Sequence, residues 1–244
     1  MAQSLKPELP MPTKNTSDTH PKSATDSSTK MAPAPWHLTG EGYVVAVWMP
    51  TSDTTSKWRW PRGHIELLVF ANYTHSDVGP YHELLHIPHL SRGIIKGYPS
   101  IDKIYVSTLA SVINGQKNWG IPKQLAQFDY QKITAQSEQD VERIQLNTLK
   151  HQPIAHIEFQ TQRLQFSVST TMLPRRLRTL VQDWQGKRFY TAPEASGHAC
   201  IASVKNWTFD PVHFPDLSQS KVLSAFKISG FNMIFPVSHK IKNI

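Results

Sequence analysis

Short runs of β-branched and aromatic residues, separated by turn-forming residues, recur along most of this chain. Such runs, bounded by Gly, Pro, Asn and Asp, are typical of strands. The predicted strands are 43–49, 65–73, 81–87, 104–108, 141–146, 154–160, 164–169, 189–191, 198–208 and 222–235. The last of them is expected to break near Gly230.

Helical periodicity is confined to two stretches. One is 110–119, and the other is 174–184, where Pro174 suits a first helical turn and apolar residues repeat at helical spacing as far as Trp184. Many strands with few short helices predict an α+β fold that is mainly β, a barrel or a sandwich.

The first 34 residues differ from the rest of the chain. They are rich in Ser, Thr, Pro and Lys and contain no aromatic residue. Such a segment cannot offset its ordering entropy by burial, so residues 1–34 are predicted to be a disordered tail. Residues 35–244 are predicted to form one domain.

The bulk composition narrows the function classes. The net charge is +8, but the basic residues are scattered along the chain, apart from Arg175, Arg176 and Arg178. Because the sequence also contains no known nucleic-acid-binding motif, we expect no nucleic-acid partner. The one cysteine, Cys200, rules out an internal disulfide and has apolar neighbours that favour burial. With no signal-peptide pattern and no long apolar run, we expect a cytoplasmic protein without membrane contact.

The segment His82-Glu83-Leu84-Leu85-His86 matches the H-E-x-x-H pattern of zinc proteases. That chemistry needs a helix, and Pro80 and Pro88 leave room for only about two turns. As a strand, the segment places Glu83 on one face with Tyr81, Leu85 and Ile87. A lone carboxylate on an apolar face is paired, protonated or functional. The alternative is a partly exposed strand on which Glu83 meets water.

Lys123 lies in an apolar stretch, after Trp119-Gly120-Ile121-Pro122 and before Leu125. A lysine in such a stretch usually extends its charge to solvent. Desolvation could instead lower its pKa, and a decrease of about 4 units would leave about half of the amine neutral at pH 7. A neutral amine can attack a carbonyl group and form a Schiff base.

Two segments resemble the acetoacetate decarboxylase family. Gly115-Gln116-Lys117-Asn118-Trp119-Gly120-Ile121-Pro122-Lys123 is similar to the family's Gly-Arg…Pro-Lys segment, and Gly79-Pro80-Tyr81-His82-Glu83 to its Gly-x-Tyr-x-Glu segment. Weaker likeness extends from Trp36–Tyr43 to Phe231–Pro236, so it covers nearly all of the predicted domain.

The resemblance implies an acetoacetate decarboxylase-like β-barrel with few short helices. It also implies a Schiff-base lysine at Lys123, with Glu83 as acid/base or positioning group. The expected substrate-binding residues are Tyr81, Trp119, Ile121 and Gln116. Members of this family form homo-oligomers and use no metal and no organic cofactor.

Three positions depart from the family pattern. Gln124 stands where the decarboxylase has a second lysine, and Gln116 where it has an arginine. The family's first-strand arginine, expected to meet a substrate carboxylate, falls near Glu41 or Gly42. Arg59, Arg62 or Arg92 could replace it. The loss of the family's first-strand arginine would affect specificity for β-keto acids more than formation of the Schiff base.

The predicted function is therefore that of a Schiff-base-forming lyase, which decarboxylates a β-keto acid through a lysine imine. Its partner would be a small-molecule keto acid or ketone. Two alternatives stay open. One is an aldolase or dehydratase of the same fold that acts on another keto acid, and the other is a non-catalytic small-molecule-binding barrel in which Lys123 is an ordinary charge.

Overall fold

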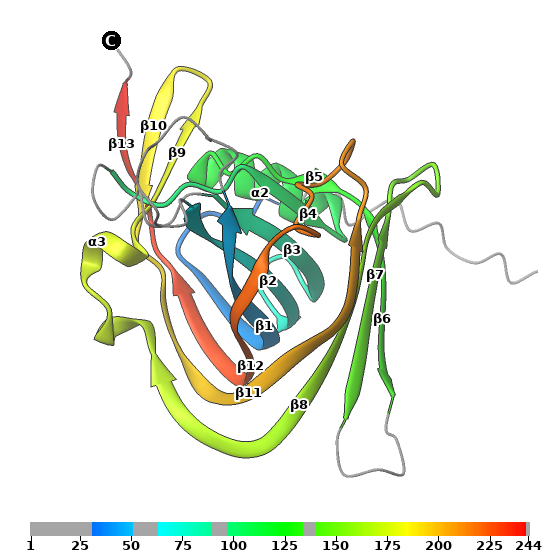
Figure 1. Cartoon of the computed structure of the whole chain (residues 1–244). Helices are drawn as coiled ribbons and strands as arrows, with labels where there is room; N and C mark the ends of the chain where they lie inside the picture. Colours follow the sequence, from blue (N-terminus) through cyan, green and yellow to red (C-terminus); the bar gives the residue numbers. More distant parts are fainter. Residues whose placement is uncertain (1–30, 51–62, 89–96, 134–139, 243–244) are drawn as a thin grey trace, which may run out of the picture.

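The computed structural model describes residues 31–50, 63–88, 97–133 and 140–242. One large sheet has the strand order β5-β4-β3-β2-β1-β12-β11-β8-β7-β6 and is antiparallel except between β4 and β5. Its strands are β1 (Trp36–Pro50), β2 (Gly63–His75), β3 (Tyr81–Ile87), β4 (Lys103–Val106), β5 (Gln124–Leu125), β6 (Gln127–Ile133), β7 (Val141–Asn147), β8 (Pro153–Ser169), β11 (Glu194–Phe209) and β12 (Lys221–Phe235). The sheet bends into a nearly closed barrel (Figure 1).

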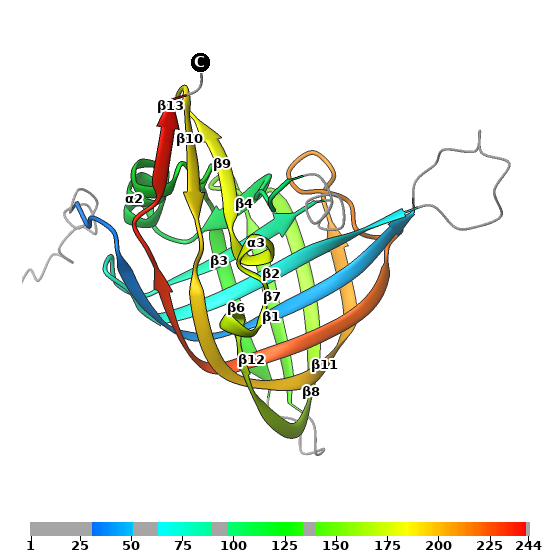
Figure 2. The same cartoon turned by 90° about the vertical axis from the view of Figure 1, so that its left-hand side faces the viewer.

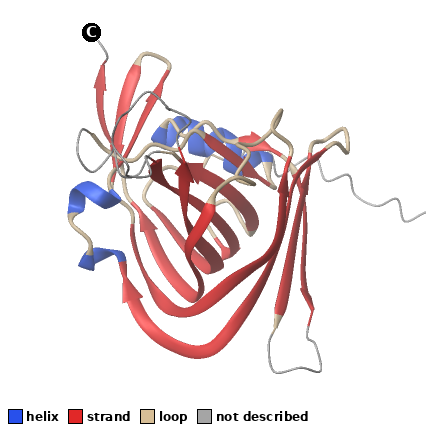
Figure 3. Ribbon diagram, in the orientation of Figure 1, coloured by secondary structure: helices blue, strands red, loops and turns tan. Residues whose placement is uncertain are grey.

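A second, small sheet stands beside the barrel (Figure 2). It has the order β13-β10-β9, formed by β9 (Leu180–Trp184), β10 (Lys187–Thr191) and β13 (His239–Lys242). Within the described ranges helices are few (Figure 3): α2 (Leu109–Trp119), α3 (Arg175–Arg178) and the 3₁₀ turn η1 (Thr170–Met172). The predicted mainly-β fold with few short helices is confirmed, and each predicted strand lies on an observed one.

The helix predicted over 174–184 is wrong. Only Arg175–Arg178 is helical, and Leu180–Trp184 forms β9, which pairs with β10. Gln185 and Gly186 join these strands, with φ of 48° and 71°. Two successive residues with positive φ form the tight turn that suits a twisted hairpin, so strand pairing overrides the helical spacing.

Other element boundaries also differ from the prediction. Residues 154–169 belong to one continuous strand, β8, rather than two, and β12 continues through Gly230, where the pairing is bulged. Strands β6 and β13 were not predicted. Residues 1–30 of the predicted tail lie outside the described residues, but Ala32 is buried and its N–H donates to Asn114 Oδ1, so the predicted tail boundary at residue 34 lies too far along the chain.

The large sheet carries a separate hydrophobic core on each face. The first core fills the barrel and includes Tyr43, Val45, Leu68, Phe70, Leu84, Ile144, Ile157 and Phe159. The second core lies on the opposite face of β1–β4, beneath α2, and includes Trp36, Leu38, Tyr73, Tyr81, Ile104, Val106, Trp119, Ile121 and Phe231. Alternation along β3 sends Tyr81 into the second core and Leu84 into the first.

Helix α2 is fixed at both ends. Thr108 caps its N-terminus by accepting a hydrogen bond from the Ser111 N–H. Gly120 ends it in the left-handed conformation, with φ of 65°, and donates to Gln116 O. The chain then turns directly into Lys123.

Two further observations concern the sequence predictions. Cys200 is buried and reduced, as its neighbours indicated. Within the described ranges, no helix combines the length and apolar character needed to cross a membrane.

Candidate active site

Lys123 and Glu83 meet in the second core. Glu83 projects from β3, and Lys123 lies between α2 and β5. The Lys123 Nζ is 2.7 Å from Glu83 Oε2, and the two side chains are 5% and 7% exposed. The sequence placed these residues 40 positions apart, and the fold joins them as a buried ion pair.

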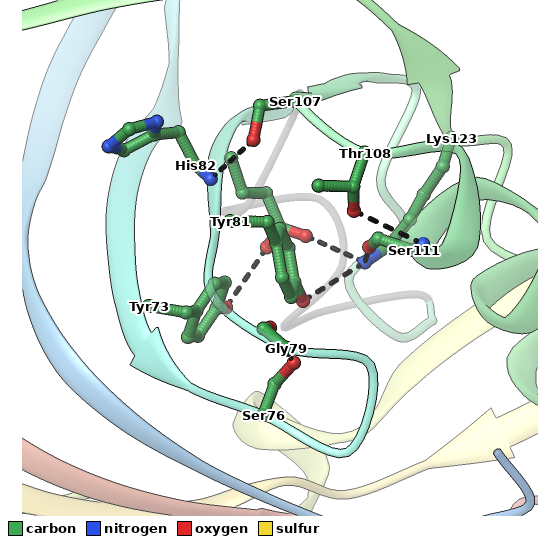
Figure 4. Close-up of polar contacts among 10 residues, drawn as sticks. Tyr73, Ser76, Gly79, Tyr81, His82, Ser107, Thr108, Ser111 and Lys123 are labelled. Atoms are coloured by element: carbon green, nitrogen blue, oxygen red, sulfur yellow. Dashed lines mark hydrogen bonds and ion pairs between the residues drawn. The ribbon is translucent and has the colours of Figure 1, made fainter. Parts of the chain in front are cut away.

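The Lys123 ammonium has three well-defined acceptors. Besides Glu83, its Nζ is 3.0 Å from Ser111 Oγ and 3.4 Å from Tyr81 OH (Figure 4). An ammonium carries three N–H donors, so these contacts satisfy the charged form. A carbonyl compound that approaches Nζ would have to replace one of them, and the Tyr81 contact is the longest.

Tyr73 supports the carboxylate from the other side. Its hydroxyl donates to Glu83 Oε1 at 3.1 Å, and its ring lies 4.6 Å from that of Tyr81. Burial raises the pKa of Tyr81, the Lys123 charge opposes this, and the result is about 12. Burial and the Glu83 charge raise the pKa of Tyr73 as well. Both hydroxyl groups therefore keep their protons near pH 7, and Tyr73 donates to Glu83 while Tyr81 accepts from Lys123.

The predicted decrease in the Lys123 pKa is not found. Burial does lower it, but the charge of Glu83 and the neighbouring hydroxyls outweigh that effect and raise the pKa of Lys123 above its ordinary value. The pair lies in the second core beneath α2, on the opposite face of the sheet from the barrel interior.

Helix α2 holds the lysine stem. A Cβ on Gly115 would lie 2.7 Å from Lys123 Cδ and 2.8 Å from Cε, so the glycine makes room for the side chain. Gln116, predicted to bind substrate, donates from Nε2 to the backbone oxygen of Lys123 at 3.0 Å. Its amide thus fixes the lysine backbone.

Trp119 and Ile121, also predicted to line a substrate pocket, are buried in the second core with Tyr81. The Trp119 ring packs edge-on against Trp36 and Phe235, and its Nε1 donates to Pro236 O at 2.7 Å. The described contacts of Trp119 are therefore with the core. Contact of either residue with substrate stays a prediction.

The positions that depart from the family pattern are spread over the sheet. Gln124 is exposed, next to a buried Lys123. Glu41 contacts Lys132 at 2.5 Å and Lys227 at 3.5 Å, in a polar cluster separate from Lys123. Arg59, Arg62 and Arg92, the possible substitutes for the family's arginine, lie outside the described residues.

The H-E-x-x-H segment is strand β3, as predicted. Glu83 faces the second core, and His86 faces away from it. His86 instead bonds Asp102 Oδ1 at 2.8 Å and Glu66 Oε2 at 2.9 Å. The arrangement needed by a zinc protease is not formed here, and the described part of the chain has no group of three or more His, Cys, Asp or Glu side chains placed to hold a metal ion.

Sequence reasoning missed Ser111 and Tyr73. Ser111 lies four residues before Gly115, so one face of α2 presents both to the lysine. Tyr73 lies directly opposite Tyr81 in the β2–β3 pair. Neither relation can be recognised until the position of the helix and the register of the two strands are known.

Solved structures share this fold at low sequence identity. An acetoacetate decarboxylase from Legionella pneumophila has a TM-score of 0.59 and 12% identity, over 86% of this chain and 88% of its own. An acetoacetate decarboxylase-like enzyme from Sphingomonas wittichii gives 0.57 and 10%, over 87% and 94%. The enduracididine biosynthesis enzyme MppR, complexed with pyruvate, gives 0.54 and 15%, over 91% and 95%.

No protein-family model and no curated protein matches the sequence. At these identities the structural likeness concerns the fold alone. The chain has the acetoacetate decarboxylase-like fold, and its chemistry has to be argued from Lys123 and its neighbours.

Proposed function

We propose that this chain is a lyase that forms a Schiff base between Lys123 and a small keto acid or ketone, and that it decarboxylates a β-keto acid. The observation that carries the proposal is the enclosed Lys123 amine, held 2.7 Å from a carboxylate. The fold supports it, because similar structures include acetoacetate decarboxylase and a pyruvate complex of MppR.

Glu83 would make the lysine reactive by accepting its proton. Transfer from Nζ to Oε2 over 2.7 Å gives a neutral amine and a neutral carboxyl group. The amine attacks the carbonyl carbon, and the resulting carbinolamine loses its oxygen as water when Glu83 returns the proton. Ser111 holds Nζ in place during both steps, while the substrate takes the place of the longer Tyr81 contact.

In a β-keto acid, the bond to the carboxylate then breaks and CO2 leaves. The electron pair moves into the protonated imine and gives an enamine, which is protonated at carbon. Water hydrolyses the new imine, which frees the ketone and restores the Lys123 amine. The protonated imine nitrogen thus acts as the electron acceptor in the step that releases CO2.

A second candidate keeps the imine and changes the reaction to an aldol or dehydration step on another keto acid. It is favoured by the three departures from the family pattern, at Gln116, at Gln124 and at the first-strand position near Glu41 or Gly42. CO2 release from acetoacetate would identify the decarboxylase. Turnover of other keto acids without CO2 release would identify the second candidate.

Borohydride reduction in the presence of acetoacetate or pyruvate is expected to fix the mass of the reduced adduct on the Lys123 peptide. Peptide mass spectrometry would locate it, and the other lysines serve as internal controls. A Lys123→Met variant should lose the adduct. If folded wild-type protein gains no mass on Lys123 with any keto acid or ketone, the proposal fails and the non-catalytic barrel is favoured.

We also propose that the chain forms a homo-oligomer. On the face that carries the second core, Val69, Val44, Phe226 and Ile201 are successive cross-strand partners. Where α2 no longer covers the sheet, this apolar row is exposed to solvent. On the neighbouring strand β8, the side chain of Leu164 is 79% exposed. Exposed contiguous apolar surface is typical of interfaces.

Light scattering is expected to show an oligomer that becomes smaller when Leu164 and Ile201 are both replaced by Glu, because the charges would be buried in the interface. A Val212→Glu variant, which changes an exposed valine on a turn, is the matched control. A monomeric wild-type protein would contradict the proposal.

A further inference from the structure

A hollow lies between α2 and the small sheet. Its volume is 290 Å³, and it is lined by Ile113, Gln116, Lys117, Trp184, Gln185, Lys187, Phe189 and Lys240. Figures 1 and 2 both show the small sheet standing next to α2. Lys123 contacts Ser111 and Gly115, which lie on the side of α2 that faces away from this hollow. The hollow is therefore distinct from the site of the Lys123 amine, and the two share only Gln116, whose amide bonds the Lys123 backbone oxygen.

Strand pairing gathers lysines on one face of the small sheet. Lys240 is directly opposite Phe189, and Lys187 is directly opposite both Trp184 and Lys242. Directly opposed residues share a face, and so do residues two apart on a strand. Like charges in direct opposition, as at Lys187 and Lys242, are destabilising unless an anion lies nearby.

The lining residues contain no carboxylate. Among the described ion pairs, none involves Lys117, Lys187 or Lys240. The acidic side chain nearest in sequence, Asp183, alternates to the other face of β9 and pairs there with Arg188 at 2.8 Å. The positive charge of the hollow is thus not neutralised by its own walls.

The floor of the hollow is aromatic. Phe189 is buried, and Lys240 Nζ lies 5.0 Å from the centre of its ring. Trp184 and Ile113 extend the apolar wall on either side. A flat apolar body can pack on these side chains while its charged groups reach the lysines, the combination that small-molecule sites use for affinity and orientation.

We propose that this hollow is a binding site for a small organic anion with two or three carboxylate groups on a flat apolar body. The three lysines at its rim recognise the carboxylates, and Phe189 and Trp184 hold the body. The volume sets an upper limit of roughly a single-ring or two-ring molecule.

Isothermal titration calorimetry with benzene-1,3,5-tricarboxylate tests this site. Lys187→Gln with Lys240→Gln should weaken binding about tenfold or more, because two charge-assisted contacts are lost. The matched control is Lys205→Gln with Lys221→Gln, which removes the same charge from exposed positions on β11 and β12 and should change the affinity less than about twofold. The double variant Glu83→Leu with Lys123→Met, which removes the Lys123 amine without leaving a buried charge unpaired, should bind as wild type does.

Several outcomes would overturn the proposal. One is the absence of any binding heat at low salt. Another is equal weakening in both double variants, which would indicate attraction to net charge alone. A third is equal binding of the neutral benzene-1,3,5-tricarboxamide. Loss of binding in the folded Glu83→Leu with Lys123→Met variant would place the tricarboxylate at the lysine site instead.

Discussion

A Glu83→Gln variant is expected to lose about 3–5 kcal/mol of unfolding free energy, because it leaves the buried Lys123 ammonium without a counter-charge. Both side chains are nearly inaccessible to water, so solvent cannot replace the carboxylate. The glutamine keeps the size of the glutamate and can still accept a hydrogen bond from Tyr73. The loss therefore reports on charge rather than on packing.

Urea unfolding near pH 7 measures this loss. The double variant Glu83→Leu with Lys123→Met removes both charges and should recover most of the stability, since apolar groups replace a buried pair at little cost. Asp183→Asn, which breaks the exposed pair with Arg188, should leave stability near that of wild type. A fully stable Glu83→Gln protein would mean that Lys123 is uncharged in the folded state.

The same variant has a distinctive pH dependence. Without Glu83, burial is the largest influence left on Lys123 and only Tyr81 opposes it, so we expect the folded pKa of Lys123 to lie below the unfolded value. A lysine with a depressed folded pKa gains stability as the pH rises from the folded pKa toward the unfolded one. The stability difference between wild type and Glu83→Gln should therefore narrow as the solution becomes alkaline. A constant difference up to about pH 10 would contradict this account.

The ion pair explains how a lysine with a raised pKa can still serve as a nucleophile. Its proton does not have to leave for solvent, because Glu83 lies within proton-transfer distance. The charged pair would be the resting form. A substrate that displaces the Tyr81 contact and desolvates the pair would favour the neutral form, in which the amine reacts.

Alternation along β3 was enough to predict that Glu83 and Tyr81 share a face, because a period of two depends only on local geometry. The apolar neighbours of Lys123 left its environment open, because a lysine in such a stretch usually extends its charge to solvent, and only the structure shows that its side chain is buried. The sequence could not tell which core receives the pair, since both faces of β1–β4 are apolar. The pKa of Lys123 also depended on a partner 40 residues away, and its sign was predicted wrongly for that reason.

The helix predicted over 174–184 failed for a related reason. Leu180, Val181 and Trp184 fit a helical repeat, but they equally fit a short strand once a partner strand exists. The tight turn at Gln185-Gly186 and the pairing with β10 decide between the two. Short apolar segments are therefore assigned by tertiary pairing, whereas the helix predicted over 110–119 agrees closely with α2.

The network around His86 predicts a loss of stability in alkaline solution. Its two ring nitrogens face Asp102 and Glu66, and Glu66 also bonds His64 at 2.7 Å. Burial lowers the pKa of His86, but the hydrogen bonds and charges of Asp102 and Glu66 outweigh it and raise the pKa from 6.5 to about 9. Because the folded pKa is the higher one, the stabilisation is complete below about pH 6.5 and disappears as the pH rises through about 9.

The shift corresponds to at most about 3 kcal/mol, and solvent screening reduces it because the Asp102 side chain is 44% exposed. Urea unfolding of wild type from pH 6 to 10 should show this decrease, and a His86→Gln variant should be less stable at pH 6 yet nearly flat over the same range. His82 lies on the same strand and the same face, and burial lowers its pKa, so His82→Gln should retain the wild-type slope. Parallel curves for wild type and His86→Gln would show that His86 is neutral in the fold, and that its two carboxylate contacts do not hold an imidazolium.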